Sequence, residues 1–193
     1  MIIGNETHKY EVAEGWGKLP EGMKHGCTHG VVVDSKDRVF IFNQSKDAVI
    51  IFDRDGKFIK SWGGLKSPHT IATDSRGRLF VGDRDNNRIQ LFDQEGRYLE
   101  TWNQFARPSG ITITRDDTIY VADSESWGPD QPGWKKGIRI GSAKDGSVKY
   151  FIEDMESTTI DHSGAEGVGV DADGNVYGAV VRRQMLEKHI RAR

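Results

Sequence analysis

The sequence is poor in cysteine and in long apolar segments, and each shortage excludes a class of protein. Cys27 is the single cysteine, so neither an intrachain disulfide framework nor a metal site built on several cysteines can form. No apolar run approaches the ~20 residues of a membrane-spanning helix. Residues 1–10 lack the apolar core of a signal peptide. We therefore expect no membrane partner, and no targeting signal sets a location.

The sequence also lacks an excess of one charge and the short motifs of several enzyme classes. Lysine and arginine number 27 against 29 aspartates and glutamates, for a net charge of −2. Nucleic acid is therefore not an expected partner. There is no glycine-rich phosphate loop and no Gly-x-Ser-x-Gly elbow, which disfavours nucleotide-dependent enzymes and serine hydrolases of the α/β class.

What the sequence does contain is a repeat with a period of 40 residues. Four segments recur without a gap: His29–Asp34 aligns with His69–Asp74, Val39–Asn43 with Leu79–Asp83, Val49–Asp53 with Ile89–Asp93, and Phe58–Trp62 with Tyr98–Trp102. A third copy begins at Ser109 and carries a long insertion, and a fourth begins at Glu166 and stops one strand short. Short strands in a fixed order, joined by tight turns, are typical of propeller blades.

The predicted fold is therefore all-β, a single β-propeller domain over residues 1–193 with about four blades. The blades are expected at about residues 29–63, 69–103, 109–152 and 166–190. Residues 10–16 line up with the outer strands that end at Trp62 and Trp102, so we expect this N-terminal strand to complete the fourth blade and close the ring. Trp16, Trp62 and Trp102 are expected to pack between blades.

Aspartates open the first hairpin turn of three blades, at Asp34, Asp74 and Asp171. Such acidic turns could be taken for calcium loops, but none has the bidentate glutamate that closes an EF-hand. Hairpin turns, in which the aspartate accepts backbone N–H bonds, are the favoured interpretation.

The segments Pro68–Asp74, Arg78–Asp83, Asn86–Asp93 and Gly96–Trp102 resemble the NHL repeat, and the resemblance covers nearly the whole chain. Within that superfamily the chain is most similar to bacterial propellers related to the peptidyl-α-hydroxyglycine α-amidating lyase domain, which usually have more blades. The resemblance implies either a small closed ring or partial rings that assemble between chains, and hence a monomer or a homodimer. Relatives are often exported, so it also favours an extracytoplasmic location with a trimmed leader.

First strands of propeller blades line the central channel, which groups two sets of residues at one end of the molecule. The starts of the first strands are His29, His69, Ser109 and Glu166, and the ends of the second strands include Asn43, Asp83 and Asp123. Two histidines and a glutamate form a known catalytic zinc set. We therefore expect either one divalent metal, zinc or calcium, at His29, His69 and Glu166, or histidines that only bond to neighbouring backbone. In the amidating lyase, histidines at related channel positions hold a zinc ion. The resemblance implies this role only for His29 and His69.

The insertion of the third copy, Ser124–Lys136, is expected to rise above the same face. Its Trp127 and Trp134 suit either a substrate wall or a seal for an enlarged blade. The segment that ends at Ser163 is expected to bring His162 near Glu166, which makes His162 a further candidate ligand.

Two function classes remain open at this point. One is a metal-dependent lyase or hydrolase acting on a small or peptide-derived substrate at the channel mouth. The other is a non-catalytic propeller that binds a peptide or protein partner on the face that carries Trp127 and Trp134. A bound stoichiometric metal would favour the first class, and an exposed patch beside a metal-free channel the second.

Overall fold

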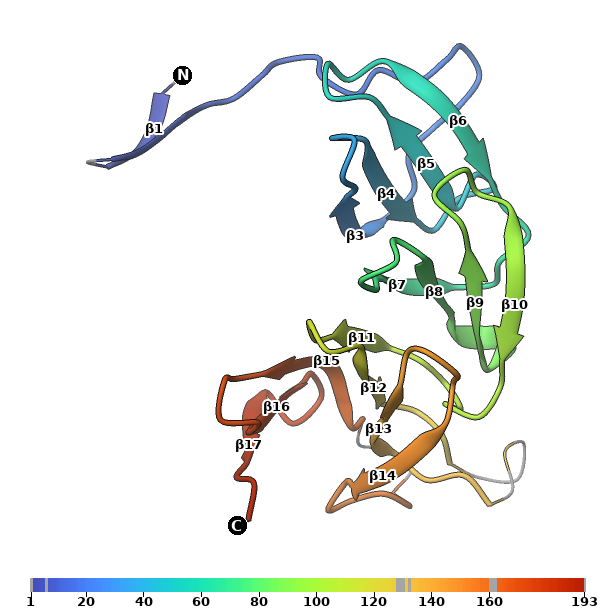
Figure 1. The fold of residues 1–193 in the computed structure, drawn as a ribbon, viewed down its shortest axis with the longest axis vertical. Coiled ribbons are helices and arrows are strands. Elements are labelled where there is room, and N and C mark those ends of the chain that lie inside the picture. Colours follow the sequence, from blue (N-terminus) through green and yellow to red (C-terminus); the bar gives the residue numbers. More distant parts are fainter. Residues whose placement is uncertain (1, 6, 128–130, 132, 160–162, 193) are drawn as a thin grey trace.

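The computed structural model describes residues 2–5, 7–127, 131, 133–159 and 163–192. Within these ranges the chain consists of short strands and one 3-10 turn, η1, at Arg84–Asn86. No helix in the described part is long and apolar enough to cross a membrane. Four antiparallel sheets follow one another around a common centre, as blades of a propeller do (Figure 1). The predicted all-β propeller fold is confirmed.

Each sheet is a meander of consecutive strands. The first contains β3 (Thr28–Val33), β4 (Val39–Asn43), β5 (Val49–Phe52) and β6 (Phe58–Trp62). The second contains β7 (Pro68–Thr73), β8 (Leu79–Asp83), β9 (Arg88–Phe92) and β10 (Tyr98–Trp102). The third contains β11 (Gly110–Ile113), β12 (Thr118–Asp123), β13 (Gly137–Ser142) and β14 (Val148–Glu153). The fourth contains β15 (Ala165–Val170), β16 (Val176–Val180) and β17 (Met185–His189).

The hydrophobic core lies between successive sheets. The middle strands are apolar on both faces, as in β5, where all four residues are buried, because a neighbouring sheet covers each face. One cluster joins the first sheet to the second through Phe42, Ile51 and Val81, and another joins the second to the third through Phe80 and Val121. The burial of these apolar side chains, worth ~25 cal/mol for each Å² of apolar surface, stabilises the packing of neighbouring sheets.

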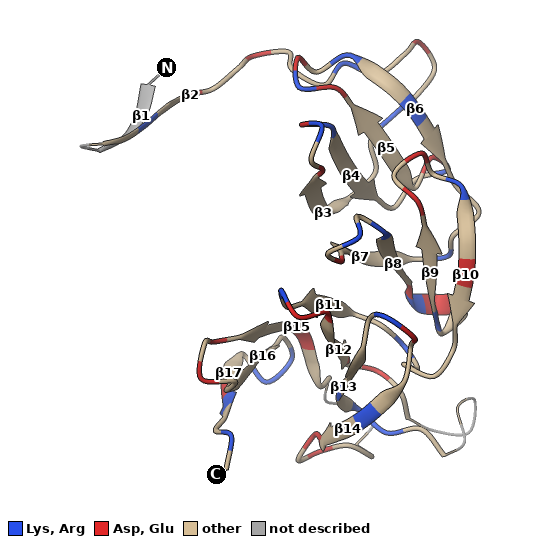
Figure 2. Cartoon of the chain, viewed as in Figure 1, with Lys and Arg blue, Asp and Glu red and all other residues tan. Residues whose placement is uncertain are grey.

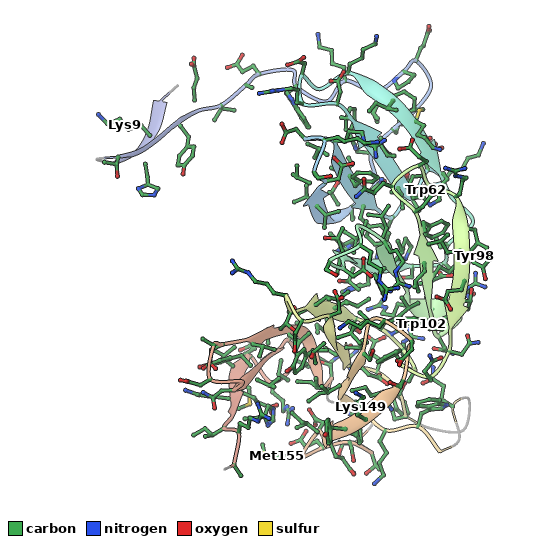
Figure 3. The ribbon with its side chains drawn as sticks, viewed as in Figure 1. Lys9, Trp62, Tyr98, Trp102, Lys149 and Met155 are labelled. Carbon is green, nitrogen blue, oxygen red and sulfur yellow. The ribbon has the colours of Figure 1, made fainter. Side chains whose placement is uncertain are left out.

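The outer strands end in tryptophans that pack on the next sheet. Trp62 lies 5.4 Å from the ring of Phe92, and Trp102 contacts Phe105 and the turn at Gly146. Figure 3 shows both tryptophans along the outer side of the row of sheets. The interpretation of these tryptophans as contacts between blades is therefore correct.

The N-terminal strand does not complete the fourth sheet, and this part of the prediction is wrong. Residues 8–11 form β2 (His8–Glu11), which pairs with β1 (Ile2–Asn5) in a separate hairpin. The reason is that Trp16 anchors this segment on the first sheet, 5.5 Å from Phe52, with its Nε1 donating to the Arg54 carbonyl at 3.2 Å. Figure 1 shows the fourth sheet at the opposite end of an open row, where β15 packs on β11 and β12.

The aspartate turns are hairpin turns, as expected, and charged residues gather in such connections (Figure 2). In the turn after β15, Asp171 Oδ1 accepts the N–H groups of Asp173 and Asn175 at 3.0 and 2.8 Å. Its Oδ2 accepts from Asn175 Nδ2 at 2.8 Å and from the Tyr177 hydroxyl at 2.9 Å. These donors favour the ionised carboxylate.

We expect the Asp171 carboxyl to titrate far below an ordinary aspartate. The Asn175 side chain, together with backbone donors and Tyr177, lowers its pKa from 3.8 to about 2. Because the pKa is lower in the folded chain, the resulting stabilisation is present above pH 3.8 and is lost as the pH falls through about 2. A carboxyl-detected NMR titration measures the midpoint, and Tyr177→Phe is expected to raise it. A midpoint near 3.8 in the wild-type chain would contradict the prediction.

Candidate functional site

The structure brings the channel-side residues together. His29 of β3 and His69 of β7 stack, with ring centroids 5.0 Å apart. His69 Nε2 lies 4.0 Å from Glu166 Oε2 of β15. His69 Nδ1 is 2.9 Å from the carbonyl oxygen of Ser109, which can only accept, so this nitrogen carries the hydrogen. One backbone bond thus orients the imidazole and leaves Nε2 facing Glu166.

This grouping does not by itself make a metal centre. Among the residues that the structure describes, no three histidines, cysteines, aspartates or glutamates are arranged to hold an ion. His29 is exposed and contributes a ring face to the stack, and the bond from His69 to Ser109 matches the structural interpretation of these histidines. Zinc or calcium at His29, His69 and Glu166 therefore stays a prediction.

The residues that end the second strands are structural. Asn43 Oδ1 accepts the Gly26 N–H at 3.0 Å, and Asp83 Oδ1 accepts the Lys66 N–H at 2.6 Å. Asp83 also accepts from Arg88 Nε at 2.7 Å. Both side chains are fully buried, so they hold the loop that enters each inner strand rather than face a ligand.

Asp123 occupies the equivalent position in the third sheet, where its partner is a buried arginine. Arg139 Nη1 lies 2.8 Å from Asp123 Oδ2, and the guanidinium is sandwiched between the rings of Trp134 and Phe151 at 4.8 and 4.7 Å. Burial raises the pKa of Asp123, an effect that Arg139 opposes. Sequence reasoning missed Arg139, although a lone arginine in the apolar strand Gly137–Ser142 is the signal of a buried partner.

A polar pocket of about 450 Å³ lies where the insertion meets the second sheet. We call it the amide pocket, because three asparagines and a glutamine dominate its lining: Asn86, Asn87, Ala106, Asn103, Ser126, Gln131 and Trp134. Among the described residues, no lysine, arginine, aspartate or glutamate lines it. Sequence reasoning found its Trp134 but not its asparagines, which lie in separate connections of one blade.

The described residues leave two polar atoms in the amide pocket without a hydrogen bond of good geometry. Gln131 Nε2 donates to Asn87 Oδ1 at 3.0 Å, but its buried Oε1 accepts no hydrogen bond from the described residues. The buried Ser126 hydroxyl lies near the Asp123 carboxylate without forming a hydrogen bond of good geometry. Buried polar groups are normally paired, so such atoms in a pocket point to a missing partner.

The remaining candidate residues lie in different parts of the molecule. Trp134 is exposed at the rim of the amide pocket, whereas Trp127 is half-buried and does not line it. Ser109 is buried, and its hydroxyl is 2.7 Å from that of Ser124, so its side chain belongs to the interior. His162 lies outside the described residues.

Comparisons with known proteins agree with this architecture. The model of the NHL repeat matches residues 65–92 and 105–126, so the chain contains NHL repeats. No curated protein matches the sequence.

Several solved propellers share the fold at low identity. The WD40 β-propeller domain of Doa1 is 17% identical, with a TM-score of 0.63 over 83% of this chain and 50% of that chain. Hydrazine synthase from Kuenenia stuttgartiensis is 17% identical, with a TM-score of 0.62 over 94% and 53%. A virginiamycin B lyase from Staphylococcus aureus is 14% identical, with a TM-score of 0.62 over 90% and 58%. The chain thus spans about half the length of these structures.

Proposed function

We propose that this propeller of NHL repeats is a peptide-binding module, and that the amide pocket receives the main chain of an extended peptide. The observation that carries this proposal is the pair of buried atoms, Gln131 Oε1 and Ser126 Oγ, to which the described residues offer no hydrogen bond of good geometry. Leaving such a group unpaired costs about 1–3 kcal/mol. A ligand that supplies a donor at this point recovers that free energy on binding.

The chemistry of the lining suits a peptide unit. Each peptide unit presents one N–H donor and one C=O acceptor, and side-chain amides supply the complement of each. Asn86 Nδ2 already donates to Asp83 and Asn87 Oδ1 already accepts from Gln131, which leaves Asn86 Oδ1 and Asn87 Nδ2 to face a ligand. Because the described lining carries no charged side chain, an uncharged ligand suits it. A volume of about 450 Å³ lies within the range of ligand pockets, ~300–1,000 Å³. Trp134 at the rim offers an indole surface for a neighbouring side chain.

The test begins with a phage-displayed library of random peptides panned on the purified chain, followed by calorimetry with the best selected peptide. Gln131→Ala and Ser126→Ala are each expected to weaken binding by roughly ten-fold, because each removes a hydrogen-bonding atom that the described residues leave unpaired. Gln131→Ala also removes the Nε2 donor of the bond to Asn87 Oδ1, so its thermal midpoint is expected to fall slightly, whereas that of Ser126→Ala should change little. Gln44→Ala, which removes an exposed amide outside the pocket, is the matched control.

Two results would overturn the proposal. One is a selected peptide whose affinity is unchanged in both pocket variants, which would place binding elsewhere. The other is that panning yields no binder while a glycan array gives binding that depends on Gln131, which would assign the pocket to a polyhydroxylated ligand.

A further inference from the structure

The two ends of the row of sheets carry complementary incomplete features. At the first end, Trp16 packs on Phe52 and on the turn at Gly56. This repeats the way in which Trp62 packs on Phe92 and on the turn at Gly96. Trp62 ends the outer strand of the first sheet and packs on the second sheet. Trp16 packs on the first sheet in the same way, so it occupies the position at which the outer strand of a preceding sheet would end.

At the other end, the fourth sheet lacks that outer strand. β17 pairs with β16 on one side, and no described strand lies on its other side. Leu186 of β17 and Ile190 just after it are exposed by 68% and 75%.

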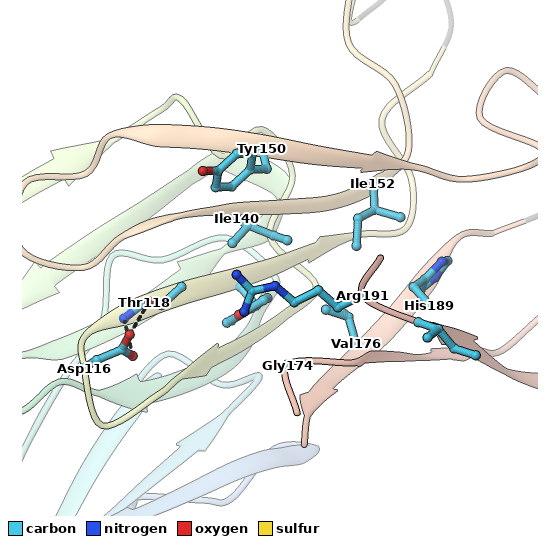
Figure 4. Close-up of a pocket in the computed structure, with 11 residues that line it drawn as sticks. Asp116, Thr118, Ile140, Tyr150, Ile152, Gly174, Val176, His189 and Arg191 are labelled. Atoms are coloured by element: carbon cyan, nitrogen blue, oxygen red, sulfur yellow. Dashed lines mark hydrogen bonds between the residues drawn. The ribbon is translucent and has the colours of Figure 1, made fainter. Parts of the chain in front are cut away.

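A groove of about 620 Å³ runs beside this open edge (Figure 4). Apolar side chains from β13 and β14, among them Ile140, Tyr150 and Ile152, line it together with Val176 and Ile190 of the fourth sheet. An apolar groove beside an unpaired strand edge is a template for strand addition.

We propose that two copies of this chain exchange their N-terminal strands, so that residues 10–16 of each copy pair with β17 of the other. Trp16 stays on the first sheet of its own chain, and residues 10–15 supply the fourth strand of the partner's fourth sheet. In the structure residues 14–17 form a turn, in which the Trp16 N–H donates to the Ala13 carbonyl at 3.3 Å, and Glu11 pairs with Ile2 of β1. The exchange therefore opens this turn and extends the segment. Two identical contacts then join the rows end to end into one closed ring around a two-fold axis. The proposal is independent of the peptide-binding function.

The existing sheets set the register of this contact. In the first and second sheets, the third-strand residue that lies opposite the fourth residue of the second strand is paired, on its other side, with the tryptophan of the outer strand. These pairs are Val49 with Trp62 and Ile89 with Trp102. In the fourth sheet the residue at that place is Leu186, opposite Ala179. Trp16 is therefore expected opposite Leu186.

This register places Glu14 directly opposite Lys188, two residues further along each antiparallel strand. Ile51 and Lys60 are the corresponding pair in the first sheet. Glu14 and Lys188 are both exposed, and opposite charges facing each other across strands stabilise a sheet. The charges agree beyond this pair, because Glu11 lies on the N-terminal strand while Arg191 follows β17.

Light scattering coupled to size exclusion is the first measurement, and a particle of twice the chain mass is expected. Lys188→Glu sets like charges opposite each other and should raise the dimer dissociation constant roughly ten-fold. The double variant Glu14→Lys with Lys188→Glu should restore it, whereas Lys46→Glu, an exposed lysine of the first sheet, should leave it unchanged.

A disulfide test distinguishes exchange from closure within one chain. In a Cys27→Ala background, Glu14→Cys and Lys188→Cys chains are mixed and oxidised, and a covalent dimer joining the two kinds of chain is expected. Leu99→Cys, an exposed position on β10, replaces Glu14→Cys in the control and should not crosslink. A monomeric wild type, or a double-cysteine chain that forms its disulfide only within itself, overturns the proposal.

Discussion

Replacing Trp102 with alanine is expected to lower the free energy of unfolding by about 3–5 kcal/mol. The side chain is 4% exposed and lies 5.3 Å from the ring of Phe80 and 5.9 Å from that of Phe105. It also fills the space over Gly146, where a Cβ would come within 2.8 Å of the indole. Its removal therefore opens a cavity between the second and third sheets that the rigid strands cannot close.

Urea denaturation followed by circular dichroism measures this loss. Leu99→Ala, on the same strand β10 but exposed, is the matched control and should cost less than about 1 kcal/mol. If the two variants lose similar amounts, Trp102 does not hold the two sheets together and the cavity argument fails.

Arg139→Met is expected to destabilise the chain by about 3–5 kcal/mol, because it leaves a buried carboxylate without its partner. The side chain of Asp123 is fully buried and that of Arg139 is 7% exposed. Methionine keeps much of the contact with Trp134 and Phe151 but removes the charge and the bond to the Lys135 carbonyl. The loss therefore reports mainly on the ion pair.

The pH dependence of this variant provides a second check. Burial already raises the pKa of Asp123, and without Arg139 the opposition that remains comes from the Ser126 side chain and from the N–H groups of Glu125 and Ser126. A buried carboxyl with a raised pKa binds a proton more readily in the folded chain than in the unfolded chain. The free energy of unfolding therefore falls as the pH rises. The deficit of Arg139→Met should thus shrink on acidification. Arg97→Met, which breaks the exposed pair with Asp93, is the control and should cost no more than about 1 kcal/mol.

The positions of the strands could be predicted because each blade repeats one local pattern. Apolar segments at a period of 40 residues, bounded by aspartate turns, leave little choice of strand order. The same reasoning brought His29, His69 and Glu166 to one place, since equivalent positions in successive blades must lie near one axis.

The features that sequence reasoning missed depend on contacts between segments without a common pattern. The amide pocket combines Asn87 from one connection, Asn103 from another and Gln131 from the insertion, and no spacing rule relates them. The N-terminal strand was placed in the fourth sheet because its residues match an outer strand. That match was sound, yet it could not say to which sheet the strand would attach.

The strands, their turns and their order follow from the sequence alone, because apolar periodicity and backbone preferences act over a few residues. The packing of the sheets sets where Trp16 docks, pairs Arg139 with Asp123, and leaves Gln131 Oε1 without a partner among the described residues. These outcomes depend on which surfaces meet when the sheets stack. Burial then sets the free energy of each polar group, and burial is a property of the assembled sheets rather than of any one segment.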